Sequence, residues 1–230
     1  MPPVVSACQP LNRTAGSRPG RGGAILVEPV GPFQNEGLLS IGKGSTFEVA
    51  GDLIELGPQA HLAVELGGLI PDEGFGRLQV TGAATLAGTL EVTLVDGFML
   101  DLGDQFAIVE CASLTGQFAK LLDPDLGHLA LAPLYQPDRL LLQAAYLGDA
   151  NLDGCVDGLD YNSWSGHYRM AGMTWLEADY NGDTMVDGLD YNNWSLNYQS
   201  GCDGTRIPEP AFAVLLIAGL GPVLRRRPNG

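Results

Sequence analysis

The 230-residue sequence predicts a mostly β chain with a small α-helical part, because two kinds of repeat occupy different parts of it. Residues 24–147 contain short segments of alternating apolar and polar residues, separated by glycine, proline and aspartate turns. Residues 148–203 contain two aspartate-rich loops of twelve residues, each followed by apolar residues at helical spacing. We therefore expect a β domain and a small two-helix domain, with segments of different character at both termini.

Residues 1–23 are rich in proline, arginine, glycine and serine and show no apolar period, which predicts disorder. They also lack the continuous apolar run of a secretory signal, since the longest candidate is Val4-Val5.

Residues 24–147 predict a β-solenoid, in which each coil of short strands stacks on the previous one. A weak internal repeat with a spacing near thirty residues supports this prediction. A β-sandwich is the alternative, because periodicity does not distinguish parallel from antiparallel stacking. The alternating segments are 46–50, 61–66, 77–81, 89–94, 106–109 and 139–143. In the repeat, Phe47, Val49 and Gly51 recur as Leu78, Val80 and Gly82, and Leu62, Val64 and Leu66 recur as Leu90, Val92 and Leu94.

The stretch 76–92, with 103–109 and 114–118 after it, resembles the closing coils of autotransporter-like passenger and surface-adhesin repeats. No combination of side chains in residues 24–147 is typical of catalysis. His61 and His128 have no nucleophile motif to serve, and alternation places Glu48, Glu65 and Glu91 as outward residues of strands. We therefore expect no enzymatic activity from this chain.

The two loops begin at Asp149 and Asp179 and predict a binding site for two calcium ions. Side-chain oxygens at positions 1, 3, 5, 9 and 12, with a main-chain carbonyl at position 7, are what a hard cation needs to replace its water. Calcium is favoured over magnesium, because many anionic ligands on a flexible loop suit a large and irregular coordination shell. The expected ligands are Asp149, Asn151, Asp153, the Cys155 carbonyl, Asp157 and Asp160, then Asp179, Asn181, Asp183, the Met185 carbonyl, Asp187 and Asp190.

An acidic solvated turn is the alternative, since Asp, Asn and Gly also dominate turns. The second loop has Thr184 where the first has Gly154, but two copies in register favour a metal site. Without a cation the crowded carboxylates repel one another, so we expect the loops to order when metal binds.

Position 12 is expected in the first turn of a helix. The first helix would carry Tyr161, Trp164 and Tyr168 on one face. Val156 and Val186, at position 8, are expected to pair the two loops side by side.

The two D-x-N-x-D-x-x-V-D-x-x-D segments, each opening a helix, resemble type I dockerins from Gly148 to Asp203. The resemblance implies a calcium-dependent module that binds a cohesin-like domain of an extracellular partner. Loop positions 10 and 11 would set specificity, and the family often has hydroxylated residues there. In this chain the expected partner-binding residues are Gly158, Leu159, Gly188 and Leu189.

The formal charge of −15 is uneven, because residues 149–203 hold ten acidic residues against Arg169 alone, a charge of −9. Such a surface argues against nucleic acid as a partner. The four cysteines lack zinc-site spacing. A bridge between Cys155 and Cys202 would stabilise the fold by roughly 4 kcal/mol. Four unpaired thiols are the alternative, because Cys8 and Cys111 have no evident partners.

Residues 204–230 combine a Pro-Glu-Pro motif, a short apolar run and a basic end, and resemble the PEP-CTERM sorting signal. The resemblance implies export, transient anchoring in the membrane by an apolar C-terminal helix, and cleavage by an exosortase-type enzyme. A buried C-terminal helix is the alternative. Because residues 1–23 lack a secretory signal, we expect the true start to lie upstream. The motif residues are Pro208, Glu209, Pro210, Arg225, Arg226 and Arg227.

Together these features predict an exported protein of the cell envelope, cell surface or extracellular space, with a calcium-dependent module for attachment or assembly. The alternative is a non-catalytic fragment of a polysaccharide-degrading extracellular enzyme or complex, of the glycoside hydrolase type. A carbohydrate-binding adhesin would need exposed aromatic stripes on residues 24–147, and that segment contains no Trp.

Overall fold

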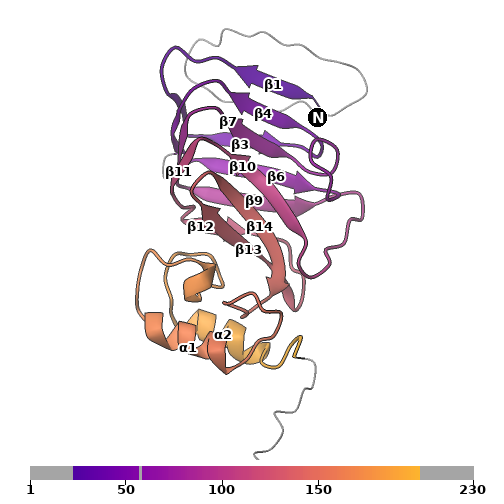
Figure 1. Cartoon of the computed structure of the whole chain (residues 1–230), viewed down its shortest axis with the longest axis vertical. Helices are drawn as coiled ribbons and strands as arrows, with labels where there is room; N and C mark the ends of the chain where they lie inside the picture. Colours follow the sequence, from indigo (N-terminus) through magenta and orange to yellow (C-terminus); the bar gives the residue numbers. More distant parts are fainter. Residues whose placement is uncertain (1–22, 57–58, 203–230) are drawn as a thin grey trace, which may run out of the picture.

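The computed structural model describes residues 23–56 and 59–202 (Figure 1). In this part of the chain, fourteen strands are followed by two α-helices and a short 3-10 helix. The prediction of a mostly β chain with two helices is thus confirmed. The expected N-terminal disorder and the expected apolar C-terminal helix concern residues outside the described ranges.

The strands are short, with three to eight residues each. Their bounds are β1 Ala24–Val27, β2 Phe33–Asn35, β3 Leu38–Ile41, β4 Thr46–Val49, β5 Leu53–Leu56, β6 His61–Leu66, β7 Arg77–Val80, β8 Ala83–Leu86, β9 Thr89–Leu94, β10 Gln105–Glu110, β11 Ser113–Gly116, β12 Lys120–Leu122, β13 Leu129–Gln136 and β14 Arg139–Tyr146.

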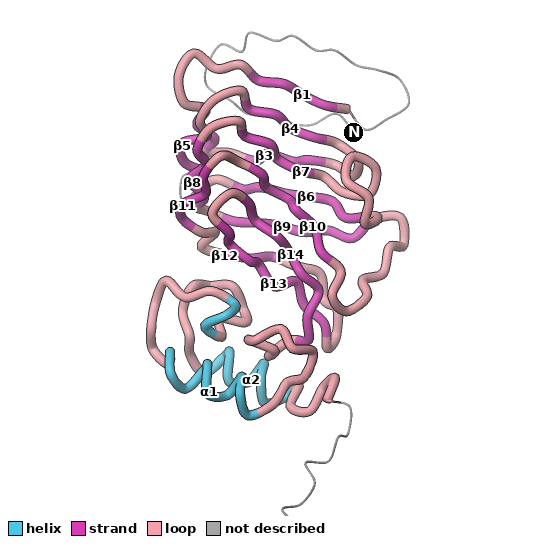
Figure 2. Tube along the Cα trace, viewed as in Figure 1, coloured by secondary structure: helices cyan, strands magenta, loops and turns pink. Residues whose placement is uncertain are grey.

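The strands form three sheets, with the orders β1-β4-β7-β10-β14-β13, β11-β8-β5-β2 and β12-β9-β6-β3. Within each sheet the parallel neighbours lie three strands apart in the chain, so the chain contributes to the three sheets in turn (Figure 2). The main core lies between the sheets, because each strand turns its apolar residues to one side.

The internal repeat of the sequence corresponds to the register of these parallel pairs. Phe47 lies opposite Leu78 and Val49 opposite Val80 in the pairing of β4 with β7. In the pairing of β6 with β9, the aligned residues are Leu62 with Leu90, Val64 with Val92 and Leu66 with Leu94.

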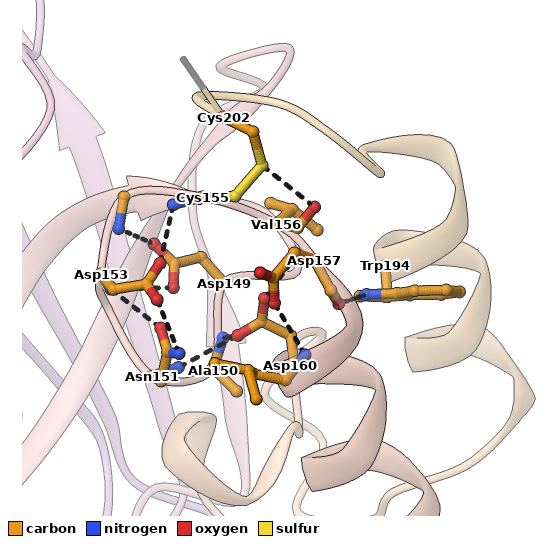
Figure 3. The surroundings of a disulfide bond; sticks show 12 residues. Asp149, Ala150, Asn151, Asp153, Cys155, Val156, Asp157, Asp160, Trp194 and Cys202 are labelled. Carbon is orange, nitrogen blue, oxygen red and sulfur yellow. Dashed lines mark hydrogen bonds between the residues drawn. A yellow bond between two sulfur atoms is a disulfide. The ribbon is translucent and has the colours of Figure 1, made fainter. Parts of the chain in front are cut away.

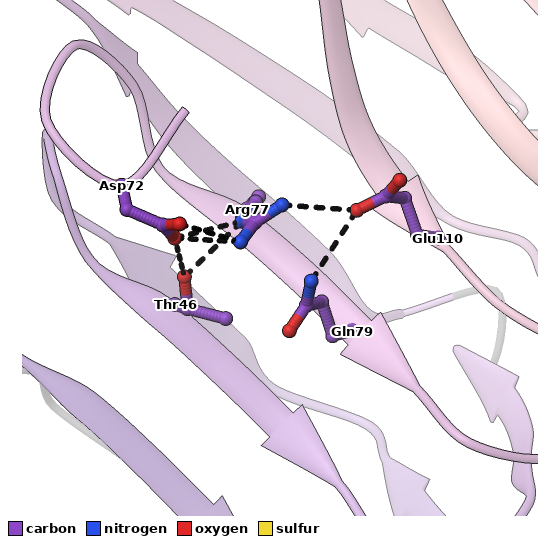
Figure 4. A network of polar contacts seen from close by, with 5 residues as sticks. All are labelled: Thr46, Asp72, Arg77, Gln79 and Glu110. Atoms are coloured by element: carbon purple, nitrogen blue, oxygen red, sulfur yellow. Dashed lines mark hydrogen bonds and ion pairs between the residues drawn. The ribbon is translucent and has the colours of Figure 1, made fainter. Parts of the chain in front are cut away.

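A polar network fastens the outer surface of the six-stranded sheet (Figure 4). Arg77 on β7 pairs with Asp72 at 2.7 Å and with Glu110 on β10 at 3.0 Å. Thr46 on β4 donates to Asp72 at 2.8 Å. The side chain of Arg77 therefore links three neighbouring strands and the loop before β7.

The antiparallel hairpin of β13 and β14 ends the six-stranded sheet and leads into the helical part. That part contains α1 (Gly158–His167), the 3-10 helix η1 (Trp175–Glu177) and α2 (Gly188–Leu196). Figure 1 places β1 at one end of the molecule and both α-helices at the other. No helix of the described ranges is both long and apolar enough to cross a membrane.

Candidate functional site

The first loop ends in a helix start that uses two of its predicted ligands. Asp157 is the N-cap of α1, and its Oδ1 accepts from the Leu159 amide at 2.7 Å. Asp160, at position 12, reaches back to accept from the Asp157 amide through Oδ2 at 2.8 Å. The two residues form a capping box, which satisfies amides that a helix start leaves without partners. The expected location of position 12 in the first helical turn is confirmed.

The remaining ligands of the first loop fold the chain around Asp149 (Figure 3). Its Oδ2 accepts from the Gly154 amide at 2.9 Å and its Oδ1 from the Asp153 amide at 3.2 Å. Asn151 accepts from the same Asp153 amide at 2.9 Å. The Cys155 amide donates to Asp153 at 3.0 Å. The side chains of Asp149, Asn151 and Asp153 thus accept hydrogen bonds from the main chain of their own loop.

The second loop repeats this arrangement residue by residue. Asp179 accepts from the Thr184 amide at 2.8 Å and from the Asp183 amide at 3.2 Å. Asp187 caps α2 through the Leu189 amide at 2.7 Å, and Asp190 accepts from the Asp187 amide at 2.8 Å. The Asp183 amide also donates to Asn181 at 2.9 Å, and the Met185 amide donates to Asp183 at 2.9 Å.

Burial makes the carboxylates at position 1 hard to ionise. It raises the pKa of Asp149 to about 6, and repulsion from Asp160 and Asp153 adds to the rise. It likewise raises the pKa of Asp179 to about 7. Burial also raises the pKa of the position-12 residues Asp160 and Asp190. None of the ion pairs in the described residues supplies a cation to these four side chains.

This donor set fits calcium. Each loop offers four carboxylates, one amide oxygen and one main-chain carbonyl, all hard oxygen ligands. Positions 1 and 12 are buried, whereas Asn151, Asp153 and Asp183 are exposed and Asn181 is half-buried, so an ion has a route in. Among the described residues no group of three or more His, Cys, Asp or Glu stands as a formed metal cluster. The fit therefore rests on the chemistry and spacing of the donors.

The two repeats contact each other through equivalent hydrogen bonds, in a pseudo-twofold arrangement. Trp164 on α1 donates its Nε1 hydrogen to the Asp187 carbonyl at 2.7 Å. Trp194 on α2 donates in the same way to the Asp157 carbonyl at 2.8 Å. Each indole therefore holds the N-cap of the other repeat's helix in place.

The expected side-by-side pairing of Val156 with Val186 is wrong. Val156 pairs with the chain after α2, through Ser200 at 3.0 Å, and Val186 pairs with the chain after α1, through Met170 at 3.0 Å. Both valines are buried. The crossed arrangement follows because each loop closes on the segment that leaves the other repeat's helix.

The expected aromatic face of α1 is present and extends onto α2. The Trp164 ring centroid lies 5.6 Å from that of Tyr161 and 5.0 Å from that of Tyr168. Contacts between Tyr161 and Trp194 at 5.1 Å, and between Trp164 and Tyr191 at 5.0 Å, join the two helices.

The expected partner-binding residues lie at the start of both helices. Gly158 and Gly188 are exposed, and the side chains of Leu159 and Leu189 are 61% and 58% exposed. The only acidic or basic side chains of α1 and α2, other than His167, are the buried Asp160 and Asp190. The exposed surface of the two helices is therefore apolar, aromatic and amide-bearing.

A disulfide joins Cys155 to Cys202, with 4.5 Å between the two Cα atoms (Figure 3). The sequence alone left this bridge and unpaired thiols as alternatives. It ties position 7 of the first loop to the end of the described helical part. Cys111 is a half-buried free thiol whose pKa is raised by burial. Cys8 and the six residues of the expected sorting signal lie outside the described ranges.

Sequence reasoning missed the residues on which the loops rest. Trp175 is buried and donates its Nε1 hydrogen to the Asp149 carbonyl at 2.6 Å. Tyr180, at position 2 of the second loop, is buried beside the carboxylates of both loops, and burial with the Asp160 and Asp149 charges raises its pKa. The sequence did hold one signal for Tyr180, because an aromatic residue stands at position 2 of the second loop where the first loop has Ala150.

Comparison with protein-family models and with curated proteins finds no match for this chain.

Proposed function

We propose that residues 148–203 form a calcium-dependent protein-interaction module of the dockerin type, used for attachment or assembly at the cell envelope. The observation that carries this proposal is the duplication. Two loops with the same oxygen donors make the same hydrogen bonds, and each loop fixes a helix that presents an exposed leucine.

Two calcium ions would be held by the twelve ligands named above, one set in each loop. Calcium supplies positive charge that offsets the repulsion among buried carboxylates. Asp157 and Asp160 would then orient α1, and Asp187 and Asp190 would orient α2, because these ligands also cap the helices. When the loops become ordered, the exposed surface of α1 and α2 is therefore fixed in the form that a partner binds.

The partner would be a cohesin-like or other protein that buries Leu159 and Leu189 together with the neighbouring Tyr161 and Tyr191. A surface rich in aromatic residues and poor in charge is typical of the core of a protein interface. The formal charge of −9 on residues 149–203 argues against nucleic acid.

The rest of the chain would carry and deliver this module. We assign residues 24–147 to the β-solenoid class, which is supported by the parallel pairing of strands three apart in all three sheets. The Pro-Glu-Pro motif, apolar run and arginines of residues 208–227 support export, transient membrane anchoring and exosortase-type processing.

Tryptophan emission tests the calcium site, because Trp164, Trp175 and Trp194 all lie in residues 148–203. Titration of the purified chain with calcium should give a saturable change that a chelator reverses. Asp149→Ala combined with Asp153→Ala should abolish about half of the response, because one of two similar sites is lost. The matched pair Asp101→Ala with Asp104→Ala, in a turn of the β domain, should leave the response intact. An unchanged emission at millimolar calcium would contradict the proposal.

A further inference from the structure

The helical part is seated on the β domain by buried apolar residues. Three small side chains of the hairpin, Ala130 and Ala132 on β13 and Ala145 on β14, leave room for a bulky partner. Trp175 and Tyr180 of the helical part fill that room and are almost completely buried. This contact is packed like the core of a domain, because two large aromatic side chains are buried against small residues on the facing strands.

The second loop also covers a strand edge. β12 is the last strand of its sheet, and its Leu121 amide donates to the Gly182 carbonyl at 3.2 Å. Before β12, the Gln117 side chain donates to the Met173 carbonyl at 3.4 Å. An edge strand needs such partners, because its outward amides otherwise remain open to other chains.

Gly182 connects this edge to the predicted calcium ligands. Its amide donates to Oδ1 of Asp179 at 2.9 Å, while its carbonyl accepts from β12. Its φ is +67°, and a Cβ added there would stand 2.8 Å from Cβ of Leu121. The observed approach of the loop to β12 therefore leaves no room for a side chain at Gly182, and Asp179 accepts a hydrogen bond from the same residue.

We propose that the second calcium loop has an additional role as a metal-dependent end cap of the β domain. Calcium held by Asp179 and the other ligands of the second loop would fix Gly182 against β12. It would also keep Trp175 and Tyr180 packed on the hairpin of β13 and β14. Stacked β structures need such a cap, because the last strands have no further coil to pair with. The inference rests on the proposed calcium binding, and it assigns unequal roles to the two loops.

Hydrogen exchange of the full chain, measured by mass spectrometry, tests this role. Calcium should slow exchange in residues 117–136, which include β12 and β13, by at least about ten-fold relative to chelator. Gly182→Ala should lose most of this protection, because the new Cβ pushes the loop off Leu121.

Gly154→Ala is the matched control. Gly154 also has a positive φ, +85°, but a Cβ there would meet nothing closer than Leu102 Cδ2 at 3.9 Å. It introduces the same backbone strain without the clash, so calcium should still protect residues 117–136. Leu121→Pro removes the donor to Gly182 without altering either loop. It should therefore give the same loss of protection and keep the tryptophan response to calcium, and it replaces Gly182→Ala if that variant does not fold.

Three results would overturn the inference, and they differ in what else they affect. A normal tryptophan response without any calcium-dependent protection of residues 117–136 contradicts the end cap alone. The absence of any tryptophan response contradicts calcium binding, and the end cap falls with it. Equal protection in the wild type, Gly182→Ala and Leu121→Pro would also contradict the role of the Gly182 contact.

Discussion

At the scale of single residues, each loop holds two residues in the left-handed backbone region, at positions 4 and 6. In the first loop they are Leu152 at φ 58° and Gly154 at φ 85°. In the second they are Gly182 at φ 67° and Thr184 at φ 71°. A β-branched side chain is strained in this region, so the second loop stores strain at Thr184 that the first loop avoids with glycine.

Thr184→Gly should therefore stabilise the chain by roughly 1 kcal/mol, since the relieved strain exceeds the entropic cost of glycine. Thermal unfolding in calcium measures this gain. The reverse substitution in the other loop, Gly154→Thr, should lower the free energy of unfolding by a similar amount and so lower the unfolding midpoint. A lower midpoint for Thr184→Gly would show that the threonine side chain contributes more than its backbone strain costs.

Arg77 should matter more to stability than any other ion-paired arginine of the described residues. Its largely buried guanidinium serves both Asp72 and Glu110, so Arg77→Met leaves these two carboxylates without a positively charged partner. The expected loss is about 1–3 kcal/mol in urea unfolding. Arg139→Met is the control, because its pair with Asp138 is exposed and should have no measurable effect on stability. Equal losses for the two variants would contradict this account.

At the scale of elements, the disulfide fastens the end of the helical part to the first loop. Replacing Cys155 and Cys202 by serine should lower the free energy of unfolding by roughly 4 kcal/mol, because the bridge closes a loop with a sequence separation of 47. Chemical denaturation under non-reducing conditions measures the loss. Cys111→Ser, which removes the free thiol, should have a much smaller effect. A double serine variant as stable as the wild type would show that hydrogen bonds alone hold the two segments together.

The sequence predicted those elements whose pattern is complete within one segment. β4 and β7 could be aligned because Phe47 and Val49 recur as Leu78 and Val80, and the helix starts could be located from Asp160 and Asp190. Strands such as β2 and β8 could not, because Phe33–Asn35 has only three residues and Ala83–Leu86 has Leu86 as its only large apolar side chain, so neither shows a period.

Contacts between distant segments were also beyond prediction. The crossed partners of Val156 and Val186 lie in irregular chain after each helix, where no periodic pattern marks them. Trp175 packs against alanines of the hairpin, and alanines in a sequence give little indication of which face of a strand is buried. Both features depend on tertiary packing, which local spacing does not encode.

At the scale of the whole molecule, stability should depend on pH in opposite ways with and without calcium. In chelator the native state retains protons on Asp149 and Asp179, whose pKa values of about 6 and 7 lie above the ordinary 3.8. The native state then binds more protons than the unfolded chain, so stability should fall as pH rises from about 4 to about 7. With calcium, protons compete with the ion, so stabilisation by calcium should grow over the same range. Midpoints of thermal unfolding across this range test both trends, and parallel curves would contradict the prediction.

The central claim is that two clusters of oxygen donors become ordered when calcium offsets their charge. Thermal unfolding of the same sample in excess chelator and in millimolar calcium tests it most directly. Calcium at a hundred times its dissociation constant should add roughly 2.7 kcal/mol per site to the free energy of unfolding and raise the midpoint clearly. Coincident unfolding curves in chelator and in calcium would contradict the claim.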